Sequence, residues 1–373
     1  MDGQLGYMRQ RGYDVTVITA PGALLQRTAT REGVQAIAVP MTRELSPLAD
    51  AVALARLTRV LRALRPSIVN AGTPKAGLLG VMAARLARVP RVVYLLRGLR
   101  FEGASGGRRL LLAGCEHVSG TLCHRVFANG DSLRARFTAM GCAPSDKVWV
   151  PGSGSSNGVD VERFAPSAQS REQARLKRQA LGLPPDAVVI GFVGRFTRDK
   201  GIAELVTAFQ RAAEREPRLR LLMVGDHDDT DPLPSSVRQA LDADPRVLAT
   251  GFVDEPAAYY PLMDVLAFPS LREGFPNVPL EAAAAGLPVV AFRAIGTVDA
   301  VVDGETGRLL AAGDVAGLEA AFLDYARHAE LRQSQGEAGR RRVVTQFRRE
   351  VVWEAIHGEY QRLLSEVDNA QER

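Results

Sequence analysis

Residues 272–290 read REGFPNVPLEAAAAGLPVV, and this order of turn-forming, helix-forming and β-branched residues predicts one repeat of a parallel α/β fold. The apolar segment before it, 264–269 (DVLAFP), is typical of a buried strand, and the Gly and Pro residues of 270–276 predict a loop. A helix is expected over 280–285, and residues 289–292 begin the next strand. Strand, loop, helix and strand in this order predict that the two strands lie parallel in one sheet.

The same stretch carries two carboxylates at a helix start. Glu273 is expected on the loop at the carboxyl end of the strand, and Glu281 in the first helical turn, because Pro279 suits that turn. Together with nearby backbone N–H groups, the two acids could hold a sugar ring and its nucleotide. Glu281 alone could instead be a favourable charge near the positive end of the helix dipole.

A second motif, VVIGFVGRFTRDKG at residues 188–201, predicts an anion site. Residues 188–193 are typical of a buried parallel strand, and Gly194 allows the chain to turn toward a helix that begins near Ile202. Arg195 and Lys200 flank that turn and suit a diphosphate, since Arg can chelate phosphate oxygens and Lys adds a mobile charge. They could also be solvated loop cations. The motif departs from both the Walker loop and the GxGxxG fingerprint, so neither ATP hydrolysis nor NAD binding is favoured.

The whole chain is consistent with a two-domain α/β enzyme. It has 373 residues, of which 46% are hydrophobic and 24% charged, enough for two cores. We expect domains at 1–165 and 166–350, with a C-terminal helix near 351–373 that crosses back to the first domain. The expected strands are 15–19, 68–71, 91–95, 126–128, 188–193, 219–224, 247–250, 264–269 and 289–292.

Charge is divided unevenly between the two halves. Residues 1–165 hold 22 Lys and Arg against 11 Asp and Glu, whereas the whole chain has 47 against 42. A basic first domain suits an anionic membrane surface or an acidic acceptor, although an Arg-rich composition also explains part of the excess. Nucleic acid is disfavoured as a partner because no nucleic-acid-binding signature is present.

No apolar run approaches the roughly 18 residues of a membrane span, and no signal peptide is visible. We therefore expect a cytoplasmic protein, with contact at the inner face of the membrane if the acceptor is lipid-linked.

Neither metal binding nor a disulfide framework is predicted. The three cysteines are irregularly spaced and, with two nearby histidines, lack the CxxC spacing of a zinc site. An acidic cluster in 226–231 could suggest a metal, but its proline-containing surroundings favour a solvated loop. The residues concerned are Cys115, Cys123, Cys142, His117, His124, Asp226, Asp228, Asp229 and Asp231.

Taken together, the motifs resemble the family 4 glycosyltransferases, retaining enzymes of the GT-B architecture, in which two Rossmann-like domains face a cleft. The resemblance covers nearly the whole chain, and TPKAGLLG and SNGVD look like the branch that builds bacterial surface polysaccharides and lipid-linked oligosaccharides. The resemblance rests on four segments: TPKAGLLG at 73–80, GSGSSNGVDVERF at 152–164, GRFTRDKG at 194–201 and EGFPNVPLE at 273–281.

The resemblance implies transfer of a glycosyl group from a nucleoside diphosphate sugar, UDP-linked by analogy, with retention at the anomeric carbon. Arg195 and Lys200 would hold the diphosphate, Glu273 would contact the transferred sugar, and Glu281 would bind the ribose. The leaving phosphate would help to deprotonate the acceptor in a front-face attack, without a metal or other cofactor. The remaining donor-binding positions implied are Gly194, Phe275, Pro276, Asn277 and Val278.

Three first-domain residues are candidates for the acceptor side. Lys75, at a helix start near 76–86, could contact an acceptor phosphate or be a solvated cap residue. Arg97 stands where many relatives have a His that contacts the donor sugar, and it has either a functional or a structural role. Asn157, in an Asn-Gly turn, lies in a segment near the donor cleft in relatives. The chain also opens on what looks like the first helix and second strand, so the first sheet is expected to lack its opening strand.

Three functions therefore stay open on sequence alone. The first is a hexosyl- or N-acetylhexosaminyl-type transferase that acts on a glycan or a polyprenyl-diphosphate-linked saccharide in polysaccharide biosynthesis. The second is a nucleotide-sugar epimerase or hydrolase of the same architecture. The third is a catalytically silent sugar-nucleotide binder, which the missing opening strand makes plausible. The sequence does not fix the donor sugar, the linkage or the oligomeric state.

Overall fold

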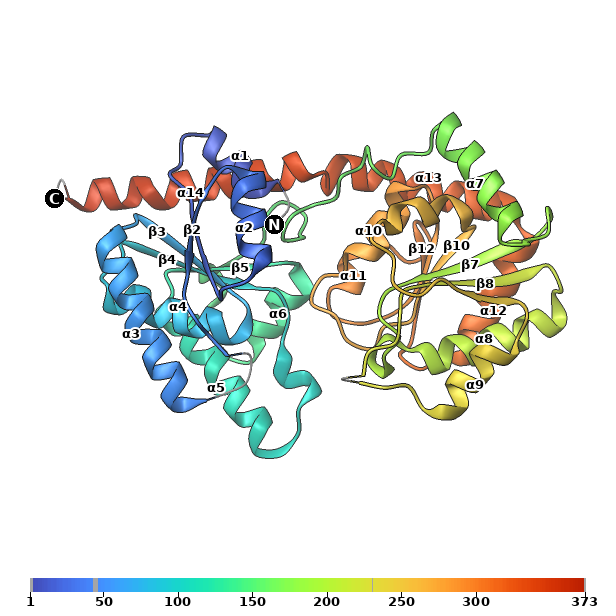
Figure 1. Cartoon of the computed structure of the whole chain (residues 1–373), viewed down its shortest axis with the longest axis horizontal. Coiled ribbons are helices and arrows are strands. Elements are labelled where there is room, and N and C mark those ends of the chain that lie inside the picture. Colours follow the sequence, from blue (N-terminus) through green and yellow to red (C-terminus); the bar gives the residue numbers. More distant parts are fainter. Residues whose placement is uncertain (1–2, 43–45, 230, 372–373) are drawn as a thin grey trace. The chain divides into compact units, whose positions relative to one another are not determined.

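The computed structural model describes residues 3–42, 46–229 and 231–371, which fold as two compact units (Figure 1). The first unit comprises Met1–Gly158 with Arg349–Arg373, and the second comprises Val159–Arg348. The sequence placed the change of domain at residue 165, whereas the contacts divide the chain at Gly158. The segment between these positions packs within the second unit, since Val159 and Phe164 belong to its core.

The first unit alternates helices and strands, as the sequence predicts for a parallel α/β domain. Its elements are α1 (Gln4–Gln10), β1 (Thr16–Thr19), α2 (Ala23–Glu32), β2 (Gln35–Ala38), α3 (Pro47–Leu64), β3 (Ile68–Gly72), α4 (Pro74–Leu86), β4 (Arg91–Leu96), η1 (Arg100–Gly103), α5 (Gly106–Leu122), β5 (Arg125–Ala128), α6 (Asp131–Ala139), η2 (Ser145–Lys147), β6 (Val148–Trp149) and α14 (Arg349–Gln371).

The strands of the first unit form two separate parallel sheets. One consists of β1 and β2 alone, and the other has the order β3-β4-β5-β6. Among the described residues, no strand pairs with the outer edge of β3 or with the second edge of β1. The first unit therefore holds two parallel sheets instead of one.

The C-terminal helix α14 is part of the first unit. Its Val352, Ile356 and Leu363 are buried against residues of β4 and β5. Its Trp353 donates a hydrogen bond from Nε1 to Oδ1 of Asn157 at 3.0 Å. These apolar and polar contacts fix the helix on the sheet. The helix extends over Arg349–Gln371, beyond the residues whose apolar spacing predicted it.

The second unit also alternates strands and helices. Its elements are α7 (Ala168–Ala180), β7 (Val188–Val193), η3 (Arg198–Lys200), α8 (Ile202–Arg215), β8 (Leu219–Val224), α9 (Ser235–Ala243), β9 (Val247–Ala249), η4 (Pro256–Leu262), β10 (Val265–Phe268), α10 (Asn277–Ala284), β11 (Val289–Phe292), α11 (Thr297–Ala300), β12 (Gly307–Leu310), α12 (Val315–Arg327) and α13 (Ala329–Gln346).

The sheet of the second unit has the strand order of a Rossmann fold. Its six strands lie parallel in the order β12-β11-β10-β7-β8-β9. The first strand of the unit, β7, is therefore central, with β8 on one side and β10 on the other. The chain order reverses between β7 and β10, and such a point marks the binding crevice of an open α/β sheet.

Helices cover both faces of this sheet (Figure 1). Every residue of β7 is buried, as expected for a strand between two helical layers. Val188, Ile190 and Phe192 pack with α8, α9 and α12 on one face. Val189 and Val193 pack with α7, α10 and α13 on the other. The sheet is therefore a rigid support for the loops that follow its strands.

Among residues 3–42, 46–229 and 231–371, no helix is long and apolar enough to cross a membrane.

Candidate active site

Both sequence motifs lie at the reversal point of the second sheet. Residues 194–201 follow β7 and residues 269–276 follow β10, and these two strands pair in parallel. The two loops therefore leave the same edge of the sheet, side by side. Ligands of open α/β sheets bind outside the carboxyl ends of the strands at this point.

Hydrogen bonds join the two loops through Asp199. Its carbonyl oxygen accepts from the Leu271 amide at 2.8 Å and from Oγ of Ser270 at 3.3 Å. Its carboxylate accepts from Oγ1 of Thr197 at 2.6 Å and pairs with Arg272 at 3.4 Å. These contacts include backbone groups of both loops and fix the two loops against each other.

A glycine lets the first loop meet the second at close range. Gly201 has a φ of 69°, and a Cβ at this position would lie 2.0 Å from the carbonyl oxygen of Pro269. No larger residue fits without moving one of the loops. The amide of Gly194 at the other end of the loop donates to the Val224 carbonyl at 2.9 Å. The loop is thus anchored at both ends, and Lys200 stands directly before its tighter end.

Lys200 and Glu273 form an ion pair between the two motifs. Nζ of Lys200 lies 2.5 Å from Oε1 of Glu273. The side chains are only 19% and 13% exposed, so neither is a solvated loop charge. The lysine ammonium also lies 5.9 Å from the ring centre of Phe268, the last residue of β10. A cation and a carboxylate therefore face each other where the strand order reverses.

Arg195 is more exposed than Lys200 and pairs with the loop after β8. Its guanidinium contacts the carboxylate of Asp228, and the two side chains are 63% and 17% exposed. In the same loop, Asp231 accepts from the amides of Arg198 and Asp199 at 3.1 and 3.4 Å. Part of the acidic cluster therefore positions the basic loop, and in the described part of the chain no cluster of acids, histidines or cysteines could hold a metal.

The position of Glu281 differs from the expected one. The helix α10 begins at Asn277, ahead of Pro279, and has no acidic residue in its first turn. A proline fits there because the first amides of a helix have no partner within it. Glu281 therefore lies beyond the first turn, which weakens its interpretation as a dipole charge. Its Oε2 accepts a hydrogen bond from the fully buried Tyr260 at 2.6 Å.

Tyr260 donates a hydrogen bond that orients Glu281, and its own hydroxyl keeps its proton. Burial, followed by the nearby Glu281 carboxylate, raises the pKa of the Tyr260 hydroxyl well above its ordinary value. The phenol comes from η4, and its ring packs edge-on against Phe164 with a centroid distance of 5.3 Å. Glu281 also interacts with other groups of the protein. The carboxylate thus has a fixed side-chain position rather than a free one.

The start of α10 leaves backbone amides open to an anion. Pro276 is its N-cap, and no side chain caps the helix. Pro276 is buried, Phe275 and Val278 are half-buried, and Asn277 is exposed. Behind this turn, Gly296 has a φ of 75°, and a Cβ on it would lie 2.2 Å from the carbonyl oxygen of Gly274. Gly296 thus supports the turn, and the first amides of a helix without a side-chain cap can bind an anion.

The three first-unit candidates occupy separate environments. Nζ of Lys75 lies 2.5 Å from Oδ1 of Asp50 on α3, and its side chain is 13% exposed, so it is not a solvated cap residue. Asn157 holds Trp353 of α14, which is a structural contact. Arg97, directly after β4, is exposed. Desolvation nonetheless lowers the pKa of the Arg97 guanidinium, so protein groups surround part of this side chain.

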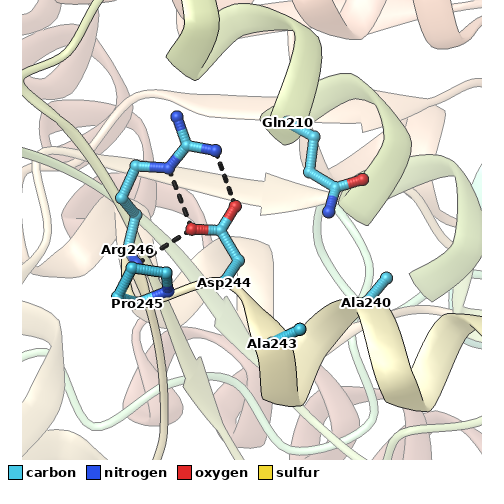
Figure 2. Close-up of a pocket in the computed structure, with 6 residues that line it drawn as sticks. All are labelled: Gln210, Ala240, Ala243, Asp244, Pro245 and Arg246. Atoms are coloured by element: carbon cyan, nitrogen blue, oxygen red, sulfur yellow. Dashed lines mark hydrogen bonds and ion pairs between the residues drawn. The ribbon is translucent and has the colours of Figure 1, made fainter.

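A shallow pocket of the second unit is separate from the motifs. It lies beside α8 and α9, and a hydrogen-bonded pair of Arg246 and Asp244 forms one side of it (Figure 2). Arg246 directly precedes β9, so the pocket opens at the amino edge of the sheet. The motifs follow β7 and β10 at the opposite edge, and we assign this pocket no role in the site.

Three residues that position the site were not predicted as such from the sequence. They are Tyr260, Asp199 and Gly296. Tyr260 lies outside both motifs, in a segment whose prolines indicate only a turn. Asp199 lies inside a motif, but its role depends on the second loop, from which it is far in sequence. For Gly296 the sequence held one indication, because a glycine before a short helix often marks a place where another backbone segment approaches closely.

Two protein families match the chain in the two units just described. Residues 3–152 match the family described as "Glycosyl transferase 4-like domain", and residues 187–328 match "Glycosyl transferases group 1". The "Capsular polysaccharide biosynthesis glycosyltransferase CapM" of Staphylococcus aureus is 32% identical over 366 residues, which cover 98% of this chain and 94% of that protein. The chain belongs to the family 4 glycosyltransferases.

A second relative and a solved structure are also similar to this family 4 glycosyltransferase. The Escherichia coli "UDP-Gal:alpha-D-GlcNAc-diphosphoundecaprenol alpha-1,3-galactosyltransferase" is 28% identical over 264 residues, covering 69% of this chain and 66% of that protein. The crystal structure of Anabaena Alr3699/HepE, solved with UDP and glucose, matches with a TM-score of 0.79 at 19% identity. That match covers 97% of this chain and 96% of the other, and confirms the GT-B fold class.

Proposed function

We propose that this glycosyltransferase moves a hexosyl or N-acetylhexosaminyl group from a UDP-sugar, with retention, to a hydroxyl of a glycan or a polyprenyl-diphosphate-linked saccharide in polysaccharide biosynthesis. The contact between Lys200 and Glu273 at the strand-order reversal is the observation that carries the proposal. The names of the CapM and E. coli relatives support the choice of pathway, donor and acceptor.

The donor diphosphate would bind between Lys200 and the start of α10. In the structure, Glu273 pairs with the lysine at 2.5 Å. A diphosphate would compete for the ammonium, and the Glu273 carboxylate would then be free to accept hydrogen bonds from hydroxyls of the sugar. The uncapped amides of Asn277 and Val278 supply further donors for phosphate oxygens.

Arg195 would join the diphosphate by leaving Asp228. The arginine side chain is 63% exposed, so its movement does not disturb the core. An exposed ion pair contributes only about 0–1 kcal/mol, whereas a guanidinium can bind phosphate through two hydrogen bonds. The exchange of Asp228 for phosphate would give the diphosphate a second cation.

Glu281 would bind the ribose hydroxyls. Tyr260 donates to Oε2, which leaves acceptor capacity on the carboxylate for a diol.

In the reaction, the bond between the anomeric carbon and the diphosphate oxygen breaks, and a bond to the acceptor oxygen forms on the same face. The acceptor proton passes to the departing phosphate. The two cations and the amides stabilise the growing negative charge, so the proposal requires no metal ion.

A transfer assay tests this function. The chain is incubated with labelled UDP-glucose, UDP-galactose, UDP-N-acetylglucosamine or GDP-mannose and a bacterial lipid extract, with and without EDTA. We expect label from a UDP-sugar in the lipid fraction, unaffected by EDTA, and an α-linked product by NMR when the donor is α-linked. Free sugar would instead indicate a hydrolase or epimerase, and bound but unreacted nucleotide a silent binder.

Lys200→Ala should remove most of the transfer. Lys177→Ala is the matched control, because Lys177 belongs to the same unit and its ammonium lies over the ring of Tyr259. Equal loss of activity in both variants would contradict the assignment of the diphosphate site to Lys200.

A further inference from the structure

The imidazole of His124 is held in one tautomer at the amino edge of the first unit's larger sheet. His124 directly precedes β5, and its backbone amide donates to the Val92 carbonyl of β4 at 2.7 Å. In return, the Val92 amide donates to Nδ1 of the ring at 2.9 Å. Val92 is fully buried, so its N–H group needs this acceptor. Because a neutral imidazole has one accepting nitrogen and one that carries a proton, the proton lies on Nε2.

Nε2 of His124 faces a second donor. Nη1 of Arg85, in the last turn of α4, lies 2.9 Å from it. A guanidinium has donors only, so it cannot accept the imidazole proton, and the protonated Nε2 cannot accept from it. Both groups can instead donate to one anion that carries several oxygens. Within the part of the chain that the structure describes, Arg85 pairs with no carboxylate.

Other cations act on the same ring. Burial, followed by the charges of Arg85, Arg91 and Lys147, lowers the pKa of His124 from its ordinary 6.5 to about 4, whereas Glu366 of α14 opposes the change. Lys147 is the last residue of η2, and Arg91 is the first residue of β4. Glu366 lies 3.5 Å from Arg91 and so offsets that arginine. The imidazole is therefore neutral at pH 7, and the charge that Arg85 and Lys147 place beside it is positive.

Two helices end at this edge, and the carbonyl end of a helix disfavours anions. Cations cover both ends. Nη2 of Arg62 donates to the Leu86 carbonyl of α4 at 3.2 Å, and Nζ of Lys147 donates to the Thr121 carbonyl of α5 at 2.8 Å. The ammonium keeps two further N–H groups for a ligand. Covering the helix ends does not account for Arg85, because its Nη1 contacts the imidazole.

We propose that Arg85, His124 and Lys147 form a binding site for a phosphate dianion on the first unit. The guanidinium, the imidazole N–H and the ammonium come from α4, the residue before β5 and η2, so a tetrahedral anion fits them better than a planar carboxylate. The guanidinium and the ammonium together match a double negative charge. Inorganic phosphate and the terminal phosphate of a small molecule share this chemistry. The site does not depend on the proposed sugar transfer.

NMR of the full chain with ¹⁵N-labelled histidine tests the site, because the chain has five histidines and the ring nitrogens report the tautomer of each. Inorganic phosphate is titrated against chloride at equal ionic strength, and His124→Gln assigns the signal. We expect the proton on Nε2 and a saturable shift at His124 with a Kd on the order of 1 mM. Arg85→Gln should weaken phosphate binding by roughly tenfold or more, because a charge-assisted hydrogen bond is lost.

Controls come from both units. Arg134→Gln removes an arginine of the first unit that is 47% exposed on α6 and pairs with Asp131, and it should bind phosphate as the unchanged chain does. Lys200→Ala should leave the response of His124 unchanged. Phosphate that binds at the proposed donor site therefore does not enter the readout, and failure of the proposed function would leave this result intact.

The source of the phosphate is distinguished by two esters. Glycerol 3-phosphate, a terminal monoester, should bind as inorganic phosphate does, whereas glycerophosphoglycerol, a diester with a single charge like that of a lipid headgroup, should bind about tenfold more weakly or less. Equal binding of the diester would overturn the assignment to a dianion. A proton on Nδ1, a His124 signal that phosphate shifts no more than chloride does, or equal losses in Arg85→Gln and Arg134→Gln would overturn the site itself.

Discussion

Glu116 should make the stability of the first unit depend on pH. The residue lies on α5, is 4% exposed, and accepts a hydrogen bond at Oε2 from the hydroxyl of Tyr94 at 2.7 Å. Burial raises the pKa of Glu116 to about 7, although the hydrogen bond from Tyr94 opposes the rise. Nearby Cys123 is buried as well, which raises the pKa of its thiol to about 11 and keeps it neutral.

The size of the effect follows from the difference between the folded and unfolded pKa. The usual value is 4.5, and each unit of difference corresponds to about 1.4 kcal/mol, so the full effect is about 3 kcal/mol. Below pH 4.5 both states hold the proton. As the pH rises from 4.5 to about 7, the unfolded chain releases the proton and the folded chain keeps it, so the free energy of unfolding falls. Above pH 7 the loss is complete.

Glu116→Gln tests this magnitude, because the amide can still accept from Tyr94 but does not titrate. The chain's two tryptophans, Trp149 and Trp353, both belong to the first unit, so their fluorescence during urea unfolding reports on that unit. Between about pH 5 and pH 8, the variant should gain on the order of 2–3 kcal/mol relative to the unchanged chain. Asp131→Asn, at a side chain 71% exposed, is the control and should gain nothing. An equal pH dependence with and without Glu116 would refute the reasoning.

Three other changes test the site. Tyr260→Phe removes the hydrogen bond to Glu281 and should raise the donor KM several-fold while lowering stability by about 1 kcal/mol; an unchanged KM in steady-state assays would separate Tyr260 from donor binding. Gly201→Ala places a methyl group 2.0 Å from the Pro269 carbonyl oxygen and should lower the stability of the second unit by more than about 1 kcal/mol in calorimetry; wild-type stability would contradict the close approach. Arg97→Ala should lower acceptor turnover without changing the melting temperature, and unaltered donor and acceptor kinetics would assign this residue to the surface.

Strong patterns in the sequence were enough to predict most of the fold. The buried β-branched run of β7 and the apolar run of β10 were correctly identified, because strands covered on both faces show continuous hydrophobicity. The strands β2, β6 and β12 were not predicted. β6 has only two residues, whereas β2 reads QAIA and β12 reads GRLL, and neither forms the continuous β-branched run that marked the predicted strands.

The structure brings Lys200 and Glu273 together as the sequence suggested, but most of the partners of the candidate site residues were not predicted. The positions of Lys200 and Glu273 in separate motifs suggested a common anion site, but the 2.5 Å contact depends on which strands are neighbours in the sheet. The start of α10 was placed too late, since Pro279 can stand anywhere in a first turn. The pairing of Lys75 with Asp50 joins two helices and has no local signal, so tertiary structure alone reveals it.

The most direct test of the central claim is the binding of UDP to the second unit's motif loops, measured by isothermal titration calorimetry on the full chain. A hydrogen bond to a charged group contributes about 1.5–3 kcal/mol, so Lys200→Ala should weaken UDP binding by roughly 10- to 100-fold, while Lys177→Ala leaves it unchanged. UDP binding of equal affinity in the unchanged chain and in Lys200→Ala would contradict the claim that the Lys200 ammonium, which pairs with Glu273 in the structure, holds the donor diphosphate.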